Sequence, residues 1–359
     1  MDAPAISLPN PATDRPPRPR RWIPLSLPKF VALVGMLLLA RLSLAEDEPA
    51  ARKKAAQSPA AAPAGDAQPT TRGNTPGEVR DDNGLKMKFL WCPAGKVIME
   101  YLIGSDRRGV PGGIEKPDND DVTVDEAKGK PETTKEIVET EVKVVPVTAV
   151  LSGFWLGKYE VTRDEWQAVM GTEPWANRKV DVTGGNYPAS YVSWNDATEF
   201  CKRLTEQERK AGRLPDGWQY TLPTEAQWEF ACRAKTETLY SFGDDESRLG
   251  SYAWIPGNTI DRDEPYPHRV GRKKPNPWGL CDMHGNVSEW CRDWSDKPPG
   301  GQDPEVKERP RGVWEMKVQR GGGWNGLEAW CRSNVRACSP PDLKKAHFGF
   351  RVALSAGKN

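Results

Sequence analysis

The sequence contains few histidines and no strong excess of charge of either sign. Three histidines occur in 359 residues, which is too few for a metal centre that uses several of them. The formal net charge of +1 provides no general attraction to a polyanion. Nucleic acid is therefore not a predicted partner.

Common catalytic motifs are also missing. None of the seven cysteines forms a C-x-x-C pair, so zinc ribbons and thioredoxin-like redox sites are not predicted. The motifs H-E-x-x-H, G-x-S-x-G and G-x-x-x-x-G-K-[ST] do not occur, so no signature of a zinc protease, an α/β-hydrolase or a P-loop protein is present. Tryptophan is abundant instead, with 15 residues beside 33 glycines and 33 prolines. This mixture is typical of a loop-rich domain packed around aromatic side chains.

The first 45 residues have the features of an export signal. Several arginines precede an apolar run at 30–40, and the small residues Ser43 and Ala45 precede a predicted cleavage site. The alternative is an uncleaved membrane anchor over residues 30–45, but the apolar run is too short to cross about 30 Å of hydrocarbon as a helix. We expect an exported protein, periplasmic or extracellular, in a compartment where disulfides persist.

Composition divides the rest of the chain into a tether, a domain and a tail. Residues 46–82 are rich in Ala, Pro and charge and predict a disordered tether. Residues 83–355 contain the apolar and aromatic segments of one domain, interrupted by a charged insertion at about 104–135. Residues 356–359 form the tail.

Three helix starts and a terminal strand pattern predict a mixed fold. Capping boxes open the segments that begin at Thr162 and Thr224, and Ser193 is a third N-cap. The segment 348–354 alternates large apolar residues with others, as a half-buried strand does. A few helices among many short strands and long loops predict an α+β fold.

Six phrases, in order along the chain, resemble the formylglycine-generating enzyme (sulfatase-modifying factor) family. They are "GFWLGKYEVTRDEWQAVMG", "YPASYVSWNDATEFCKRL", "YTLPTEAQWEFACRA", "NPWGLCDMHGNVSEWCRDW", "RGGGW" and "FGFRVAL". The resemblance covers about residues 83–355. It implies a loop-rich α+β fold related to the C-type lectin-like fold.

The resemblance implies a copper site that is incomplete here. Founding members oxidise a cysteine of sulfatases to formylglycine with oxygen and copper(I), which two cysteines bind; soft thiolates select this ion. Counted forward from Gly321, the first cysteine position is Gly326 and the second is Cys331. Counted backward from "GFR", Cys331 falls on a non-catalytic position. At least one catalytic cysteine is absent on either count, so copper is not an expected cofactor.

The role of Cys331 stays open between three alternatives. It is half of a disulfide, a buried free thiol, or a metal ligand or nucleophile. The resemblance indicates Cys232 as the disulfide partner, because family members bridge the helix that contains it to this segment. An odd number of cysteines leaves at least one unpaired.

The turn "CDMHGNVSEW" resembles a structural calcium site of the family. The resemblance implies four ligands, namely the Asp282 side chain, the carbonyl groups of Gly285 and Val287, and Glu289. Oxygen ligands of this kind suit Ca²⁺. The alternative is a metal-free turn in which Asn286 and Glu289 bond backbone groups. His284 is expected to be a polar turn residue, and the family's second calcium turn is expected to be missing because Trp254 replaces an asparagine.

Three residues are candidates for a binding groove. Arg332 and Arg336 resemble arginines that line the family's substrate groove, and Trp324 offers an aromatic surface for a sugar or peptide. The alternatives are a salt-bridged scaffold for the arginines and a core position for the tryptophan.

The leading functional prediction is an exported binding module for a peptide, glycan or protein ligand. The alternatives are an active formylglycine-generating oxidase and an oxidase with other metal chemistry, so the sequence leaves open whether the chain is an enzyme. A membrane is a predicted partner only with an uncleaved leader.

Overall fold

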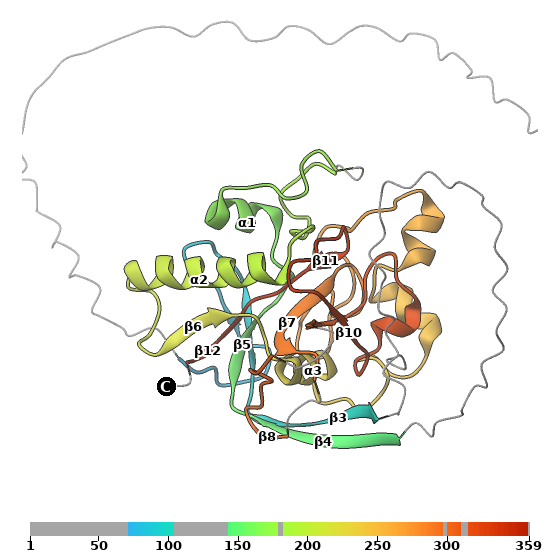
Figure 1. Ribbon diagram of the computed structural model, residues 1–359, viewed down its shortest axis with the longest axis horizontal. Coiled ribbons are helices and arrows are strands. Elements are labelled where there is room, and N and C mark those ends of the chain that lie inside the picture. Colours follow the sequence, from blue (N-terminus) through green and yellow to red (C-terminus); the bar gives the residue numbers. More distant parts are fainter. Residues whose placement is uncertain (1–70, 104–142, 179–181, 297–299, 310–314, 358–359) are drawn as a thin grey trace, which may run out of the picture. The chain divides into compact units, whose positions relative to one another are not determined.

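A computed structural model describes residues 71–103, 143–178, 182–296, 300–309 and 315–357, which are coloured in Figure 1. The predicted leader (1–45), the charged insertion (104–135) and most of the predicted tether lie outside the described residues. No described helix is long and apolar enough to cross a membrane.

The largest sheet joins the two ends of the domain. Its strand order is β1-β2-β5-β12-β6, with the bounds β1 (Val79–Arg80), β2 (Phe89–Cys92), β5 (Phe154–Gly157), β6 (Trp218–Thr221) and β12 (Ala353–Ala356). In β12, Leu354 lies opposite Trp155 of β5 and Tyr220 of β6. The C-terminal strand is therefore held on both sides by strands from earlier in the chain.

Two smaller sheets complete the strand structure of the described residues. One has the order β10-β9-β7-β11, with the bounds β7 (Ser288–Trp294), β9 (Lys317–Arg320), β10 (Arg336–Ser339) and β11 (Phe348–Gly349). The other has the order β3-β4-β8, with the bounds β3 (Gly95–Ile103), β4 (Lys143–Leu151) and β8 (Gly301–Gln302). Strand β9 runs antiparallel to β7 and to β10, and it leads into the glycine-rich segment 321–323.

The predicted N-caps open the three α-helices of the part of the chain that the structure describes. These are α1 (Arg163–Met170), α2 (Trp194–Lys210) and α3 (Glu225–Arg233). Thr162, Ser193 and Thr224 each form a complete capping box, which satisfies backbone N–H groups that the first turn leaves unpaired. Among the described residues, four short 3₁₀ segments follow later, namely η1 (Glu246–Ser251), η2 (Pro256–Asn258), η3 (Ile260–Arg262) and η4 (Glu328–Cys331).

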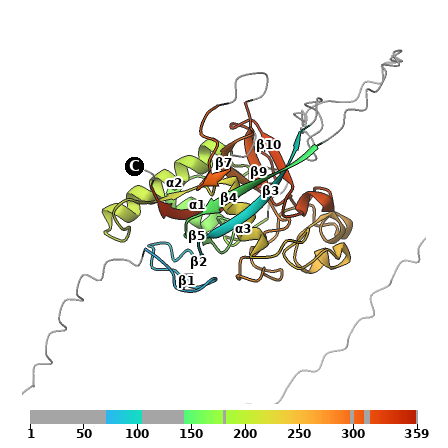
Figure 2. The ribbon, with the colours of Figure 1, turned by 90° about the horizontal axis from the view of Figure 1, so that it is seen from below.

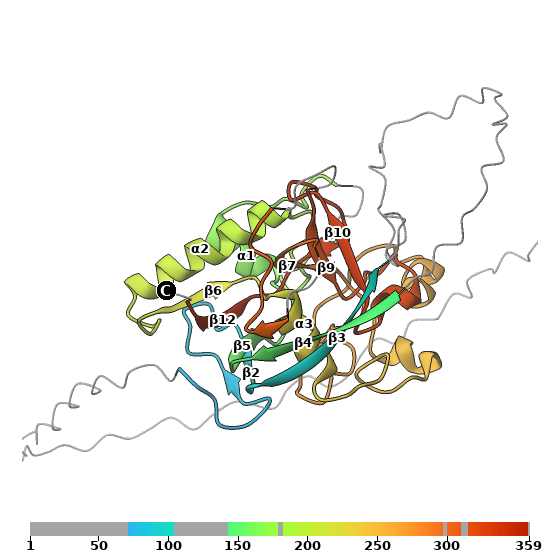
Figure 3. The same ribbon diagram turned by 60° about the horizontal axis from the view of Figure 1, so that its bottom comes forward.

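Aromatic rings fill the core on both sides of the large sheet. Helices α1 and α2 lie together on one side of it (Figure 1), where the rings of Trp166, Phe200 and Phe350 pack within 5.3 to 6.1 Å of one another. Helix α3 lies between the β3–β4 pair and the sheet that contains β7 and β9 (Figures 1 and 3), and it buries Trp228 and Phe230. Figure 2 shows β3 and β4 side by side. Burial of such large side chains supplies most of the stability of a loop-rich fold.

Two sequence predictions need correction. The tether does not extend to residue 82, because Val79 and Arg80 of β1 pair with β2. The segment 348–354 is not one half-buried strand. Strand β11 ends at Gly349, and all seven residues of the segment are buried. Alternate residues of this segment were expected to be exposed. Arg351 is one of them, and it can be buried because it forms an ion pair with Glu289.

Candidate functional site

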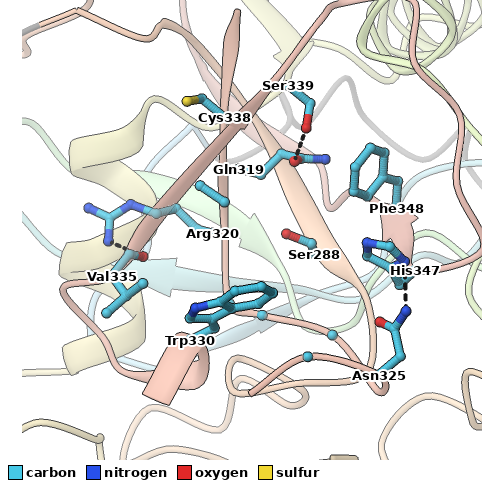
Figure 4. Close-up of a pocket in the computed structure, with 15 residues that line it drawn as sticks. Ser288, Gln319, Arg320, Asn325, Trp330, Val335, Cys338, Ser339, His347 and Phe348 are labelled. Atoms are coloured by element: carbon cyan, nitrogen blue, oxygen red, sulfur yellow. Dashed lines mark hydrogen bonds between the residues drawn. The ribbon is translucent and has the colours of Figure 1, made fainter. Parts of the chain in front are cut away.

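A cavity of about 40 Å³ lies where β9 meets the glycine-rich segment 321–323 (Figure 4). Strand β10, the segment η4 and strand β11 form its other walls. The side chains at its surface include Ser288, Gln319, Asn325, Trp330, Cys338, Ser339, His347 and Phe348. This is the part of the chain in which the sequence placed a catalytic cysteine, so we treat the cavity as the candidate site.

Glycine is required in the segment that borders the cavity. Gly321 and Gly322 have φ angles of 93° and 70°, in the left-handed region that disfavours other residues. A Cβ atom on Gly322 would lie 2.9 Å from the Cys331 sulfur. The glycines therefore let η4 pack directly against the end of β9.

Cys331 does not reach the cavity. Its side chain has no exposed surface and lies in an apolar cluster with Tyr240, Leu249, Ala253 and Ile255. Burial raises the pKa of the Cys331 thiol, so the thiolate that would bind a metal or attack a substrate is disfavoured.

Position 326 does line the cavity, but as a glycine beside an aromatic ring. A Cβ atom on Gly326 would lie 3.0 Å from the Trp330 ring. Gly326 and Cys331, the two positions that the forward count matched to the copper-binding cysteines, therefore have different surroundings. Gly326 lines the cavity, whereas Cys331 is buried in the core. The cysteine at the cavity is Cys338.

Cys232 lies on α3, where its sulfur contacts side chains of two other segments. Its sulfur lies 3.8 Å from His284 Nε2 and donates to Ser333 Oγ at 3.6 Å. Burial raises the pKa of the Cys232 thiol to about 12. All seven cysteines are free thiols, so the predicted bridge between Cys232 and Cys331 is not formed in this structure.

His284 is a buried turn residue that connects distant segments. Its Nδ1 donates to the carbonyl oxygen of Cys331 at 2.7 Å, and its Nε2 accepts from the Ser241 backbone N–H at 3.2 Å. Burial lowers the pKa of His284 to about 4, so the ring is neutral near pH 7. The histidine thereby fixes the position of η4 behind the cavity.

Arg320 at the end of β9 holds one wall of the cavity in place. Its buried guanidinium forms ion pairs with Glu225 at 3.0 Å and Glu229 at 2.5 Å, both on α3. It also donates to the carbonyl oxygens of Ser333 and Val335. Sequence analysis missed this network, because its partners come from segments that are far apart in the chain.

The two predicted groove arginines are engaged in ion pairs. Arg336 pairs with Glu225 at 2.7 Å, and Arg332 pairs with Glu246 at 3.2 Å on the surface. Neither side chain lines the cavity. The geometry is that of the salt-bridged alternative.

The tryptophan at the cavity is Trp330, not Trp324. Trp324 is buried and does not line the cavity, whereas Trp330 forms one of its walls (Figure 4). Opposite Trp330, the Asn325 side-chain amide donates to His347 Nδ1 at 3.1 Å. Sequence analysis assigned no role to Gln319, Asn325 or His347, since none of them belongs to a recognisable motif.

The predicted calcium turn contains a buried group of charges. Both Glu289 oxygens are bound by Arg351, each at 2.6 Å, and one of them also accepts from Trp228 Nε1. Asp282 has one oxygen, Oδ1, that is buried without a hydrogen-bond partner. The carboxyl group of Glu160, which sequence analysis overlooked, accepts a hydrogen bond from the backbone N–H of Val287.

These charges do not balance. Asp282, Glu160 and Glu289 lie near the positive charges of Arg351 and Lys273, so carboxyl groups outnumber the positive charges and leave a deficit of positive charge. Burial raises the pKa of Asp282 to about 6 and also raises the pKa of Glu160. Among the described residues, no group of three or more His, Cys, Asp or Glu side chains is arranged to hold a metal ion, so a cation here would depend on Asp282 and backbone carbonyl groups.

Comparisons with a family model and with curated proteins indicate the same family. The family model described as "Sulfatase-modifying factor enzyme 1-like domain" matches residues 111–356, which is more than half of the chain. A protein of Paenibacillus barcinonensis named "Chaperone protein LppX" is 29% identical over 214 residues, covering 48% of this chain and 70% of that protein. The "Formylglycine-generating enzyme" of Streptomyces coelicolor is 33% identical over 188 residues, covering 49% of this chain and 55% of that enzyme.

The fold is shared with a solved structure. PvdO from Pseudomonas aeruginosa has a TM-score of 0.56 at 23% sequence identity, covering 79% of this chain and 100% of that one. This likeness confirms the predicted loop-rich α+β fold. The chain spans about half the length of the curated Streptomyces enzyme that it matches.

Proposed function

The chain belongs to the sulfatase-modifying factor family. We propose that within this family it acts as a binding module and not as a copper oxidase. One observation carries the proposal. The cavity beside the glycine-rich segment has Gly326 at its surface, while Cys331 is sealed in an apolar cluster. A ligand that enters the cavity therefore meets neither of the thiols that the family's copper chemistry needs.

The chemistry of copper(I) supports this proposal. A two-thiolate site requires both sulfurs to be deprotonated and close to one another. Cys331 has a raised pKa and no exposed surface. Cys338 lines the cavity, and burial raises the pKa of its thiol as well. A single thiol of this kind does not replace the pair.

The alternative is an active formylglycine-generating oxidase. It would require η4 to open and bring Cys331 into the cavity, against the loss of its apolar packing. A second alternative, an oxidase with other metal chemistry, would require a metal-binding group of side chains, and none is found among the described residues.

The test is a direct assay for the family reaction. The full chain, reduced and loaded with copper(I), is incubated under oxygen with a peptide that contains Cys-x-Pro-x-Arg, with a formylglycine-generating enzyme as positive control. We expect the peptide mass to stay unchanged. Conversion of the peptide cysteine to an aldehyde, abolished by Cys331→Ser, would show that the chain is an oxidase.

We also propose that the protein is exported by means of residues 1–45, because their composition is that of an export signal. Mass spectrometry of the protein from its native host reads the N-terminus. A mature chain that begins near Glu46 is the expected result. A chain that begins at Met1 and fractionates with membranes would support the anchor instead.

For the turn at 282–289 we propose a structural calcium ion. Asp282 Oδ1 is a buried oxygen without a partner, and the deficit of positive charge around Arg351 suits a divalent cation. Asp282 and the carbonyl groups of Gly285 and Val287 would hold the ion. Glu289, which is bound by Arg351, would contribute mainly its charge.

A further inference from the structure

The cavity presents a buried hydrogen-bond donor without a partner. Gln319 on β9 is 1% exposed, and its Nε2 group forms no hydrogen bond in the part of the chain that the structure describes. Its Oε1 accepts from Ser339 Oγ at 3.1 Å, which fixes the orientation of the amide (Figure 4). A buried donor without a partner is unfavourable, so it marks a place where a ligand can supply an acceptor.

The backbone around the cavity also has N–H groups without partners, whereas several of its carbonyl groups are already hydrogen-bonded. The carbonyl oxygens of Gly321, Gly323 and His347 already accept hydrogen bonds, from three backbone N–H groups at 2.7 to 3.1 Å. The N–H groups of Gly322 and Gly323 donate to no group among the described residues. Successive N–H groups next to left-handed residues form a concave surface that suits an anion.

The charge around the cavity permits an anion. None of the fifteen residues that line it is Asp or Glu. Arg320 lies at its edge, and Ser288 contributes a hydroxyl group. An anionic ligand would therefore meet uncharged donors and no carboxylate of the cavity's own, since the Arg320 guanidinium is already paired with Glu225 and Glu229.

The size of the cavity limits the group that enters. About 40 Å³ is room for roughly three atoms of the size of a water molecule, at about 10–15 Å³ for each. A carboxylate has three non-hydrogen atoms, whereas a sugar ring is several times larger. The cavity is therefore large enough for a carboxylate group.

We propose that the cavity is a carboxylate-binding site, in which Gln319 Nε2 and the N–H groups of Gly322 and Gly323 donate to the two carboxylate oxygens. Hydrogen bonds to a charged acceptor are about twice as strong as those between neutral groups. This inference rests on the proposed binding function and names its ligand group. The carboxylate comes either from the C-terminus of a partner peptide or from an Asp or Glu side chain.

The first experiment measures binding of the simplest probes. The full chain is titrated with acetate and, separately, with the neutral isostere acetamide, and chemical shifts of the glycine amide groups are followed by NMR. We expect saturable shifts at Gly322 and Gly323 with acetate, and binding of acetamide that is weaker by about tenfold or more. Equal binding of the two probes, or no shift with either, would overturn the proposal.

Two variants identify the donor. Gln319→Glu introduces a like charge and is expected to weaken acetate binding by about tenfold or more. Gln207→Glu makes the same chemical change on the exposed face of α2 and is expected to leave acetate binding within about twofold. Gln319→Met removes the donor without adding charge, so it replaces Gln319→Glu where the latter is shown by circular dichroism to be unfolded. Acetate affinity that is unchanged in every folded Gln319 variant would contradict the assignment.

Capped tripeptides separate the two sources of the carboxylate. One has a free C-terminus and neutral side chains, the second has an internal Asp and an amidated C-terminus, and the third is fully neutral. Binding of either acidic peptide above the neutral one supports the proposal and identifies the source. Equal binding of all three would overturn the carboxylate assignment and leave the binding function standing, whereas oxidation of the Cys-x-Pro-x-Arg peptide would overturn the binding function itself.

Discussion

At the residue scale, glycine decides how closely two segments approach beside the cavity. Gly322 combines a φ of 70° with a sulfur atom 2.9 Å from the place where a Cβ would lie. Gly212, at the end of α2, has a nearly identical φ of 68° but open space around it. The two positions therefore separate the cost of the backbone conformation from the cost of crowding.

We predict that Gly322→Ala lowers the free energy of unfolding more than Gly212→Ala does. Both substitutions pay for a left-handed alanine, about 1–2 kcal/mol, and only the first also forces Cys331 to move, which adds about 1–3 kcal/mol. Urea unfolding of the two variants measures the difference. Equal destabilisation would show that η4 does not pack against the glycine segment as described.

At the element scale, buried charges connect the strands to helix α3. Asp293 on β7 accepts from the Glu225 backbone N–H in the first turn of α3 at 2.7 Å and from the Val306 N–H at 2.8 Å. Burial, together with the nearby negative charge of Glu225, raises the pKa of Asp293 to about 6. The unfolded chain has an aspartate pKa of about 3.9.

The raised pKa predicts a pH dependence with a definite sign. Between about pH 4 and pH 6 the folded protein keeps a proton on Asp293 that the unfolded chain has released, so the contribution of this residue to stability falls as the pH rises. Asp293→Asn removes the dependence. We expect the stability of the wild type relative to this variant to fall by about 2 kcal/mol between pH 4 and pH 7, as measured by urea unfolding at each pH. A difference that stays constant would show that Asp293 is ionised throughout.

At the scale of the whole molecule, the turn at 282–289 lies where β7, β11 and the "KYEVT" segment meet. Glu160 from that segment bonds Asn286 as well as the neighbouring backbone, and Arg351 from the C-terminal segment binds Glu289. A cation in this turn would therefore stabilise the contacts between several parts of the fold.

We predict that calcium raises the melting temperature of the protein. A ligand present at one hundred times its dissociation constant stabilises the folded state by about 2.7 kcal/mol, which corresponds to a rise of roughly 5 °C or more for a domain of this size. Calorimetry in CaCl₂ and in EDTA measures it, with MgCl₂ as control. The rise should vanish in Asp282→Ala and persist in Asp216→Ala, an exposed position. The same melting temperature in CaCl₂ and EDTA would leave the turn metal-free.

The sequence by itself determined the family, the α+β class and the starts of the three helices. It could do so because capping residues act within one turn of chain, and because the family phrases are contiguous. It also predicted that the copper pair is incomplete, on a count that left open whether Gly326 and Cys331 are the two positions.

Only the tertiary structure decided which side chains reach the cavity. Cys331 and Trp324 lie near the glycines in the sequence but are buried away from the cavity, whereas Gln319 reaches it from β9 and His347 from the turn before β11. The pairing of Glu289 with Arg351 spans 62 residues. Burial and ion pairing depend on which segments meet in space, and no local pattern in the chain encodes that.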